Sequence, residues 1–130
     1  MTKKSGSSEL HKLLADMNQT GGFPISVLTD LNGLPIAAAA KNGLDPERQS
    51  AVVAMAQKMA AQVGKQLGMA QADEISLYDA NGQRLVCRPF STKSHNLILA
   101  IIVSERQRSY RRITNQTIGE ICKVWTEFWE

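Results

Sequence analysis

The feature that most constrains the fold is a hairpin motif that occurs twice. Residues 28–37 read LTDLNGLPIA, and residues 77–86 read LYDANGQRLV. Both follow the pattern L-x-D-x-N-G, then two residues, an aliphatic residue and Ala or Val. Asn-Gly between apolar runs favours a two-residue turn because both residue types tolerate a positive φ. The chain therefore contains two antiparallel hairpins, and a single repetition is too little for a solenoid.

The remaining elements follow from periodicity and end signals. Ser8 is a candidate N-cap for a first helix, which Gly21 and Gly22 end. Asp45 followed by Pro46 predicts the start of a long helix between the hairpins. The pattern predicts helices at 8–22, 46–68 and 107–129 and strands at 23–29, 34–40, 74–79, 83–90 and 97–103.

This order, α-β-β-α-β-β-β-α, predicts an α/β (α+β) fold with one five-stranded antiparallel sheet and helices on both faces. The continuously apolar segment 97–103 is typical of a central strand covered on both sides. Pro35 near the start of segment 34–40 favours an edge strand. The alternation in segment 74–79 and its short flanking turns favour a second edge.

Size and composition fit one small domain. The chain has 130 residues and a mass of 14.3 kDa, which leaves room for one core. We expect a flexible polar tail at 1–8 and a domain at 9–130. The longest apolar run, 97–103, is far shorter than the about 20 residues of a membrane span. Cys87 and Cys122 form no CxxC pair, so we expect reduced thiols and a cytoplasmic protein.

Motifs for catalysis or cofactor binding are missing from the sequence. It contains no GxxxxGK[ST] or GxGxxG phosphate-binding loop. His11 and His95 have no further ligands at metal-binding spacing. The Asp and Asn residues of the two hairpins lack the distal Glu of a calcium loop, so turn chemistry explains them better. We therefore expect no enzyme activity, no metal and no cofactor.

The long helix has an apolar arc of about 160°. Such a width has two interpretations: a broad core face on a small sheet, or a seam for self-association. Exposed edge strands invite pairing, so a helix and an edge strand together favour a two-fold interface. The expected interface residues are Val52, Met55, Ala56, Met59, Val63, Glu74, Ser76 and Tyr78.

A basic cluster lies near the start of the last helix, although the net charge is only +3. Three interpretations are open: a solvated helix face, a docking patch for an acidic protein, and a site for nucleic acid or an anionic membrane. Nucleic acid is disfavoured because Tyr110 is the only aromatic residue nearby. The basic patch comprises Arg106, Arg108, Arg111 and Arg112.

Over residues 9–128, the order and motifs resemble the roadblock/dynein-light-chain domains, relatives of the longin fold. The resemblance rests on Gly21-Gly22, the run VLTDLNGLPIA at 27–37, the Ala- and Met-rich helix 46–68, the hairpin 77–86 and the apolar strand 97–103. It implies a homodimer in which the long helices pack side by side and the third strands join two sheets into one of ten strands. It brings no catalytic residues. The bacterial gliding-motility GTPase regulators of this family are similar in size, but this chain has a shorter N-terminal arm and more arginines in its last helix.

Family members bind small Ras-like GTPases or serve as scaffold or motor-adaptor subunits. The resemblance therefore implies a non-enzymatic regulatory dimer that binds a small Ras-like GTPase and could stimulate its GTP hydrolysis. The alternatives are a scaffold without effect on GTP turnover and a small-ligand sensing module. The expected GTPase-facing residues are the polar ones outside the apolar arc: Gln57, Lys58, Gln62 and Lys65.

Overall fold

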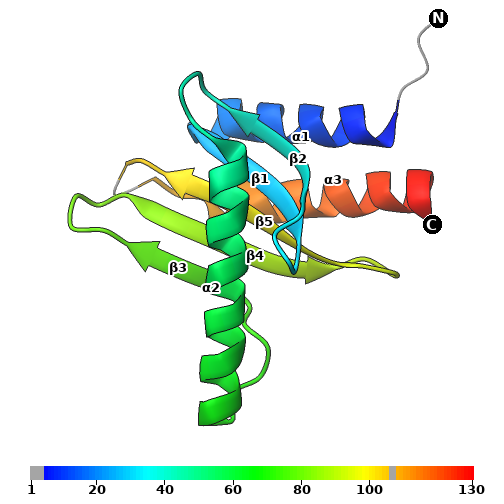
Figure 1. Ribbon diagram of the computed structural model, residues 1–130. Helices are drawn as coiled ribbons and strands as arrows, with labels where there is room; N and C mark the ends of the chain where they lie inside the picture. Colours follow the sequence, from blue (N-terminus) through cyan, green and yellow to red (C-terminus); the bar gives the residue numbers. More distant parts are fainter. Residues whose placement is uncertain (1–4, 106–107) are drawn as a thin grey trace, which may run out of the picture.

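The computed structural model describes residues 5–105 and 108–130 and confirms the predicted order of elements (Figure 1). The helices are α1 (Gly6–Gly21), α2 (Pro46–Leu67) and α3 (Arg111–Trp129). The strands are β1 (Ile25–Asp30), β2 (Pro35–Ala40), β3 (Ile75–Tyr78), β4 (Arg84–Ser91) and β5 (Asn96–Val103).

The five strands form one antiparallel sheet in the order β2-β1-β5-β4-β3. The apolar strand β5 lies at the centre, and β2 and β3 lie at the edges. Pro35 is the first residue of β2, where a missing N–H costs the sheet least. The predictions of a central β5 and of two edge strands are confirmed.

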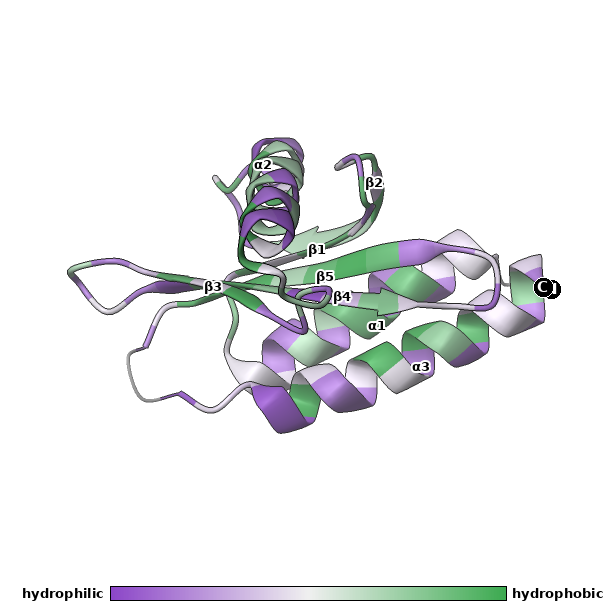
Figure 2. Cartoon of the chain, turned by 90° about the horizontal axis from the view of Figure 1, so that it is seen from below, coloured by the Kyte–Doolittle hydropathy of each residue, from purple (hydrophilic) through white to green (hydrophobic). Residues whose placement is uncertain are grey.

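Helices cover both faces of the sheet, as predicted. Figure 2 shows α2 on one face and α1 and α3 together on the other. The larger core lies under α1 and α3 and includes Leu14, Phe23 and Trp125. The core beneath α2 is smaller and centres on Val53 and Ile98. α2 is therefore attached to the sheet by few apolar contacts.

The hairpin turns are built by their Asp-x-Asn-Gly residues, as predicted. The Asp30 carboxylate accepts hydrogen bonds from the backbone N–H groups of Asn32 and Leu34, at 2.9 and 3.0 Å. Asp79 does the same in the second hairpin. Gly33 has a φ of 82°, in the left-handed region. A Cβ there would also lie 2.6 Å from the Cβ of Ala54, so Gly33 allows α2 to approach the turn.

Two helix starts differ from the prediction. α1 begins at Gly6, with Ser5 as N-cap and Ser8 as its capping-box partner, so residues 6–8 belong to the helix and not to a tail. The first four residues of the expected tail lie outside the described residues. α3 begins at Arg111 instead of residue 107, after Tyr110, whose side chain makes no capping hydrogen bond. α2 has the predicted ends, with Asp45 as N-cap and Gly68 as C-cap.

Candidate functional site

α2 contacts its own sheet through a narrow strip. Its buried residues are Ser50, Val53 and Ala54. The five large apolar residues elsewhere on this helix are between 43% and 69% exposed: Val52, Met55, Met59, Val63 and Leu67. The interpretation of the wide arc as a broad core face is therefore wrong, because most of the arc points away from the core.

Helical geometry divides the exposed surface of α2 into three faces. Successive residues turn by about 100° around the axis, and Ser50 and Val53 mark the side that faces the sheet. Met55 and Met59 then lie on the outer face, roughly opposite the sheet. One flank, which we call the apolar flank, carries Val52, Ala56, Ala60, Val63 and Leu67.

The opposite flank, the polar flank, carries the exposed Lys58, Gln62 and Lys65. These three residues were expected to face a GTPase. Gln57, the fourth of that set, is half-buried on the sheet side of the helix. The α2 residues of the expected interface set also lie on two different faces. Met55 and Met59 lie on the outer face. The apolar flank carries Val52, Ala56 and Val63.

The C-terminal half of α2 projects beyond the sheet. Figure 1 shows the helix crossing the strands and continuing past β3. Leu67 at its end and Met69 just after it are 69% and 64% exposed. This half of the helix therefore presents apolar side chains where its own sheet no longer covers them.

The edge strand β3 presents different residues on its two faces. Leu77 pairs with Leu85, which packs on the α2 side of the sheet with Ile75. Leu77 therefore lies on the α2 face, where it is 66% exposed. Ser76 and Tyr78, which the sequence predicted in the interface in place of Leu77, point to the opposite face. Alternation along the strand separates the two sets, but only the position of α2 shows which set adjoins that helix.

Glu74, also expected in the interface, is engaged within the chain. Its Oε2 accepts a hydrogen bond of 2.7 Å from the Tyr110 hydroxyl, and its Oε1 accepts one of 2.7 Å from Nη1 of Arg111. Nε of the buried Arg88 lies 4.0 Å from Oε1. Burial and the Glu74 carboxylate raise the pKa of Tyr110. Burial lowers the pKa of Arg88, and the nearby Arg111 lowers it further.

The side chain of Arg84 joins this cluster from β4. Its guanidinium lies 3.9 Å from the ring centroid of Tyr78 and 5.2 Å from that of Tyr110. A guanidinium over an aromatic face is a favourable cation–π arrangement. Tyr78 thus packs beside Arg84 on the face opposite to α2.

The arginines of the predicted basic patch do not form one continuous surface, because they have different partners. Arg111 pairs with Glu74 and, at 3.4 Å, with Asp73. Arg108 lies before α3 and pairs with Glu105 at 3.1 Å. Arg112 is exposed in the first turn of α3, and Arg106 lies outside the described residues. Arg108 and Arg112 share a shallow depression between α1 and α3.

The described part of the chain offers no candidate metal site. Residues 5–105 and 108–130 contain no cluster of three or more His, Cys, Asp or Glu side chains that could hold a metal ion. Burial raises the pKa of the Cys87 thiol to about 12, so this cysteine is a packing residue. No helix among the same residues is long and apolar enough to cross a membrane.

An antiparallel sheet with one long helix on one face and a helix pair on the other is the roadblock fold, of the kind found in MglB proteins. Myxococcus xanthus MglB has a TM-score of 0.80 and 15% identity, over 100% of this chain and 97% of that one. An MglB structure with a tetrameric arrangement has a TM-score of 0.75 and 12% identity, over 98% and 95%. A Roadblock/LC7 domain from Streptomyces avermitilis has a TM-score of 0.70 and 13% identity, over 90% and 94%.

No protein-family model and no curated protein sequence matches the chain. The structural comparisons establish the fold, and they confirm at that level the roadblock resemblance of the sequence.

Proposed function

We propose that this protein is a non-enzymatic, homodimeric regulator that binds a small Ras-like GTPase. The observation that carries the proposal is the exposed apolar surface of α2, which its own sheet leaves uncovered. Monomeric proteins rarely expose apolar patches of such extent without a partner. Solved MglB structures of the same fold include one with a tetrameric arrangement, which supports self-association.

The apolar flank of α2 is the proposed seam between two copies. Val52 and Leu85 line the same hollow, and Leu85 pairs with Leu77 on β3, so this flank faces the β3 side of the sheet. Ala56 and Ala60 are small enough to let a second helix come close. Pairing of two β3 edges would join the sheets into ten strands, and the projecting half of each α2 would then lie over the sheet of its partner.

Such a seam would bury exposed apolar residues of both α2 and β3. Stable two-fold interfaces bury about 1,600 Å² in total. Val63 and Leu67 on the projecting half of α2 and Leu77 on β3 supply apolar area for this contact. Ser76 and Tyr78 would contribute from the other face of the joined sheet, and Glu74 from its position just before the edge strand.

The outer face and the polar flank of α2 form the proposed GTPase surface. They remain exposed when the apolar flank is covered. Lys58, Gln62 and Lys65 border the outward Met55 and Met59 on one side, so that a polar rim adjoins an apolar centre, as in non-obligate interfaces. Gln57 has a smaller role because it is half-buried. Stimulation of GTP hydrolysis would act by ordering the switch loops of the GTPase rather than through an inserted arginine.

The test uses the small Ras-like GTPases of the same organism, each loaded with GDP or a non-hydrolysable GTP analogue. We expect one of them to bind, and the double substitution Lys58→Glu with Lys65→Glu to weaken binding at least tenfold while the dimer persists. The control Lys12→Glu with Lys123→Glu makes the same charge change on α1 and α3. Absence of binding in both nucleotide states would replace the regulator by the scaffold alternative.

A further inference from the structure

The turn between β1 and β2 carries an exposed leucine on a rigid backbone. The Asp30 carboxylate accepts hydrogen bonds from the backbone N–H groups of Asn32 and Leu34, at 2.9 and 3.0 Å. The carbonyl of Leu34 in turn accepts a hydrogen bond of 3.2 Å from the N–H of Asp30. These bonds fix the backbone of Leu34, yet its side chain is 65% exposed. The turn therefore holds a large apolar side chain in water.

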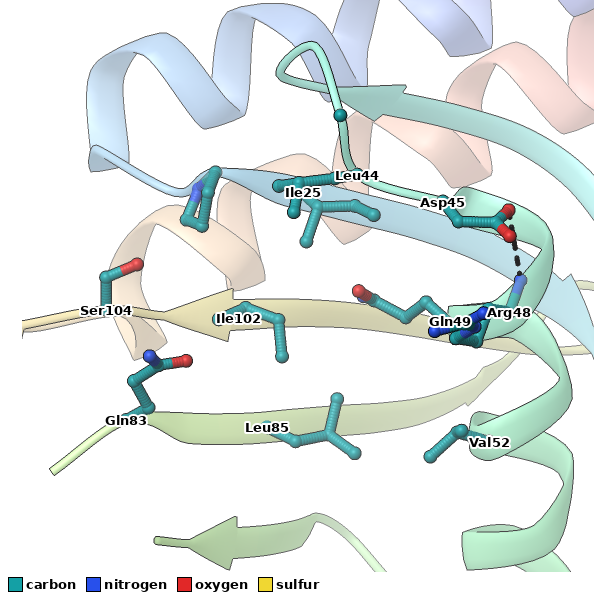
Figure 3. Close-up of a pocket in the computed structure, with 12 residues that line it drawn as sticks. Ile25, Leu44, Asp45, Arg48, Gln49, Val52, Gln83, Leu85, Ile102 and Ser104 are labelled. Carbon is teal, nitrogen blue, oxygen red and sulfur yellow. Dashed lines mark hydrogen bonds between the residues drawn. The ribbon is translucent and has the colours of Figure 1, made fainter. Parts of the chain in front are cut away.

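The second hairpin shows that the turn itself does not require this leucine. Gln83 occupies the position of Leu34 in the repeated motif. The Asp79 carboxylate accepts hydrogen bonds from the N–H groups of Asn81 and Gln83, at 2.9 and 2.8 Å, as in the first turn. Figure 3 shows Gln83 near Leu85 on β4, at the edge of the hollow beside α2. A polar residue thus suffices for the same turn, and the apolar side chain of Leu34 needs another explanation.

The first turn adjoins the polar flank of α2. A Cβ on Gly33 would lie 2.6 Å from the Cβ of Ala54, so the turn and the helix touch here. At about 100° per residue, the residues that follow Ala54 around the helix toward the outer face are Lys58, Ala51 and Met55. Figure 1 and Figure 2 show β2 and β3 on opposite sides of α2. A second copy on the β3 side would therefore leave the first turn uncovered.

The polar flank beside this turn is positively charged. Lys58 and Lys65 are exposed, and neither has an ion-pair partner among residues 5–105 and 108–130. Glu47, the one carboxylate of α2, lies in its first turn, about three helical turns before Lys58. The Asp30 carboxylate is engaged by the N–H groups of its own turn. Two unpaired cations beside an apolar patch favour a partner surface that carries carboxylates.

On the basis of the proposed GTPase surface, on which this inference rests, we propose that Leu34, Ala51 and Met55 form its apolar centre. The GTPase meets this centre with an apolar side chain and pairs carboxylates with Lys58 and Lys65. Leu34 is exposed and already ordered by its turn, so little backbone freedom is lost when a partner covers it. The first hairpin thus becomes a second element of the surface, and an acidic face of the GTPase becomes its complement.

Leu34→Gln, which gives the first turn the residue of the second, tests the apolar centre. The probe is the GTPase that the wild-type protein binds, in the nucleotide state that binds. We expect about tenfold weaker binding by calorimetry, because a large apolar side chain no longer enters the contact. Leu34→Met keeps an apolar side chain of similar size and should keep the affinity within about twofold. The urea midpoint and the dimer mass should match the wild type in both variants.

Ionic strength tests the acidic complement. Raising KCl from about 0.05 to about 0.5 M screens exposed charge pairs and should weaken binding of the wild type. The double variant Lys58→Gln with Lys65→Gln should lose most of this salt dependence, whereas Leu34→Gln should keep it. An affinity independent of salt, or an unchanged affinity in Leu34→Gln, would overturn the inference and leave the GTPase regulator in place. Absence of any binding by the wild type would instead remove the proposed function, and this surface with it.

Discussion

The Tyr110 hydroxyl donates a 2.7 Å hydrogen bond to Oε2 of Glu74 and so links the residue before α3 to the residue before β3. Arg111 strengthens the link through Oε1 of the same carboxylate. The edge strand proposed for pairing is thereby held by α3 on one face of the sheet. This anchor fixes the position of β3 within a single chain, before any partner binds.

Replacement of Tyr110 by Phe tests this anchor. The change removes one hydrogen bond to a charged acceptor and leaves the packing of the ring, so the free energy of unfolding should fall by about 1.5–3 kcal/mol. Urea denaturation of wild type and variant measures the difference. An equal stability of the two proteins would show that the bond contributes nothing to the fold.

The raised pKa of Tyr110 predicts that the free energy of unfolding depends on pH. Its raised pKa means that folding favours the neutral phenol. This contribution is complete below the unfolded-state pKa of about 10 and is lost as the pH rises through the higher folded-state pKa. The stability difference between wild type and Tyr110→Phe should therefore be constant at neutral pH and shrink above about pH 10. A difference that grows in alkali would contradict the assignment.

Gly33 and Gly43 form a matched pair for the contact between the first hairpin and α2. Both have a positive φ, at 82° and 90°. A Cβ at Gly33 would meet Ala54 at 2.6 Å and the Ser50 carbonyl oxygen at 2.8 Å, whereas one at Gly43 would meet nothing within 4 Å. Gly43→Ala should cost about 1–2 kcal/mol for the backbone alone. Gly33→Ala should cost clearly more, as measured by thermal or urea unfolding.

The two cysteines should differ in reactivity. Burial holds the pKa of Cys87 at about 12, so almost no thiolate forms at pH 8 in the folded protein. Cys122 is half-buried on α3. Ellman's reagent should therefore label at most one thiol of the native protein at pH 8 and both thiols in denaturant. Labelling of a Cys122→Ser variant in the native state would contradict the burial of Cys87.

The sequence predicted the elements whose ends are encoded locally. Asp45-Pro46 and Gly68 bound α2 because capping depends on the residues at the helix ends themselves. The Asn-Gly pairs fixed both hairpins for the same reason. The start of α3 was predicted too early because Tyr110 gives no side-chain cap, and the start of α1 too late because Ser5 and Ser8 form the capping box together.

The candidate surface was less predictable because it depends on which side of each element faces the core. Periodicity showed that α2 is broadly apolar, but only Ser50 and Val53 reveal which part of the arc contacts the sheet. Glu74 was assigned to the interface from its place in an edge strand, while its partners Tyr110 and Arg111 are 36 and 37 residues away. No local pattern encodes a contact of that separation.

Val63 and Gln62 are adjacent in sequence and lie on different flanks of α2, so they give a controlled test of the seam. Val63→Glu places a charge on the apolar flank and should weaken self-association at least tenfold. Gln62→Glu adds the same charge on the polar flank and should leave self-association unchanged. Analytical size exclusion over a range of concentrations compares the two. Equal effects of both substitutions would place the seam elsewhere on the molecule.

Sedimentation equilibrium of the wild-type protein tests the central claim most directly. The chain has a mass of 14.3 kDa, so a two-fold assembly through α2 and β3 predicts a species of twice that mass, 28.6 kDa, at micromolar concentrations. A mass of 14.3 kDa that persists into the high micromolar range would contradict the homodimer.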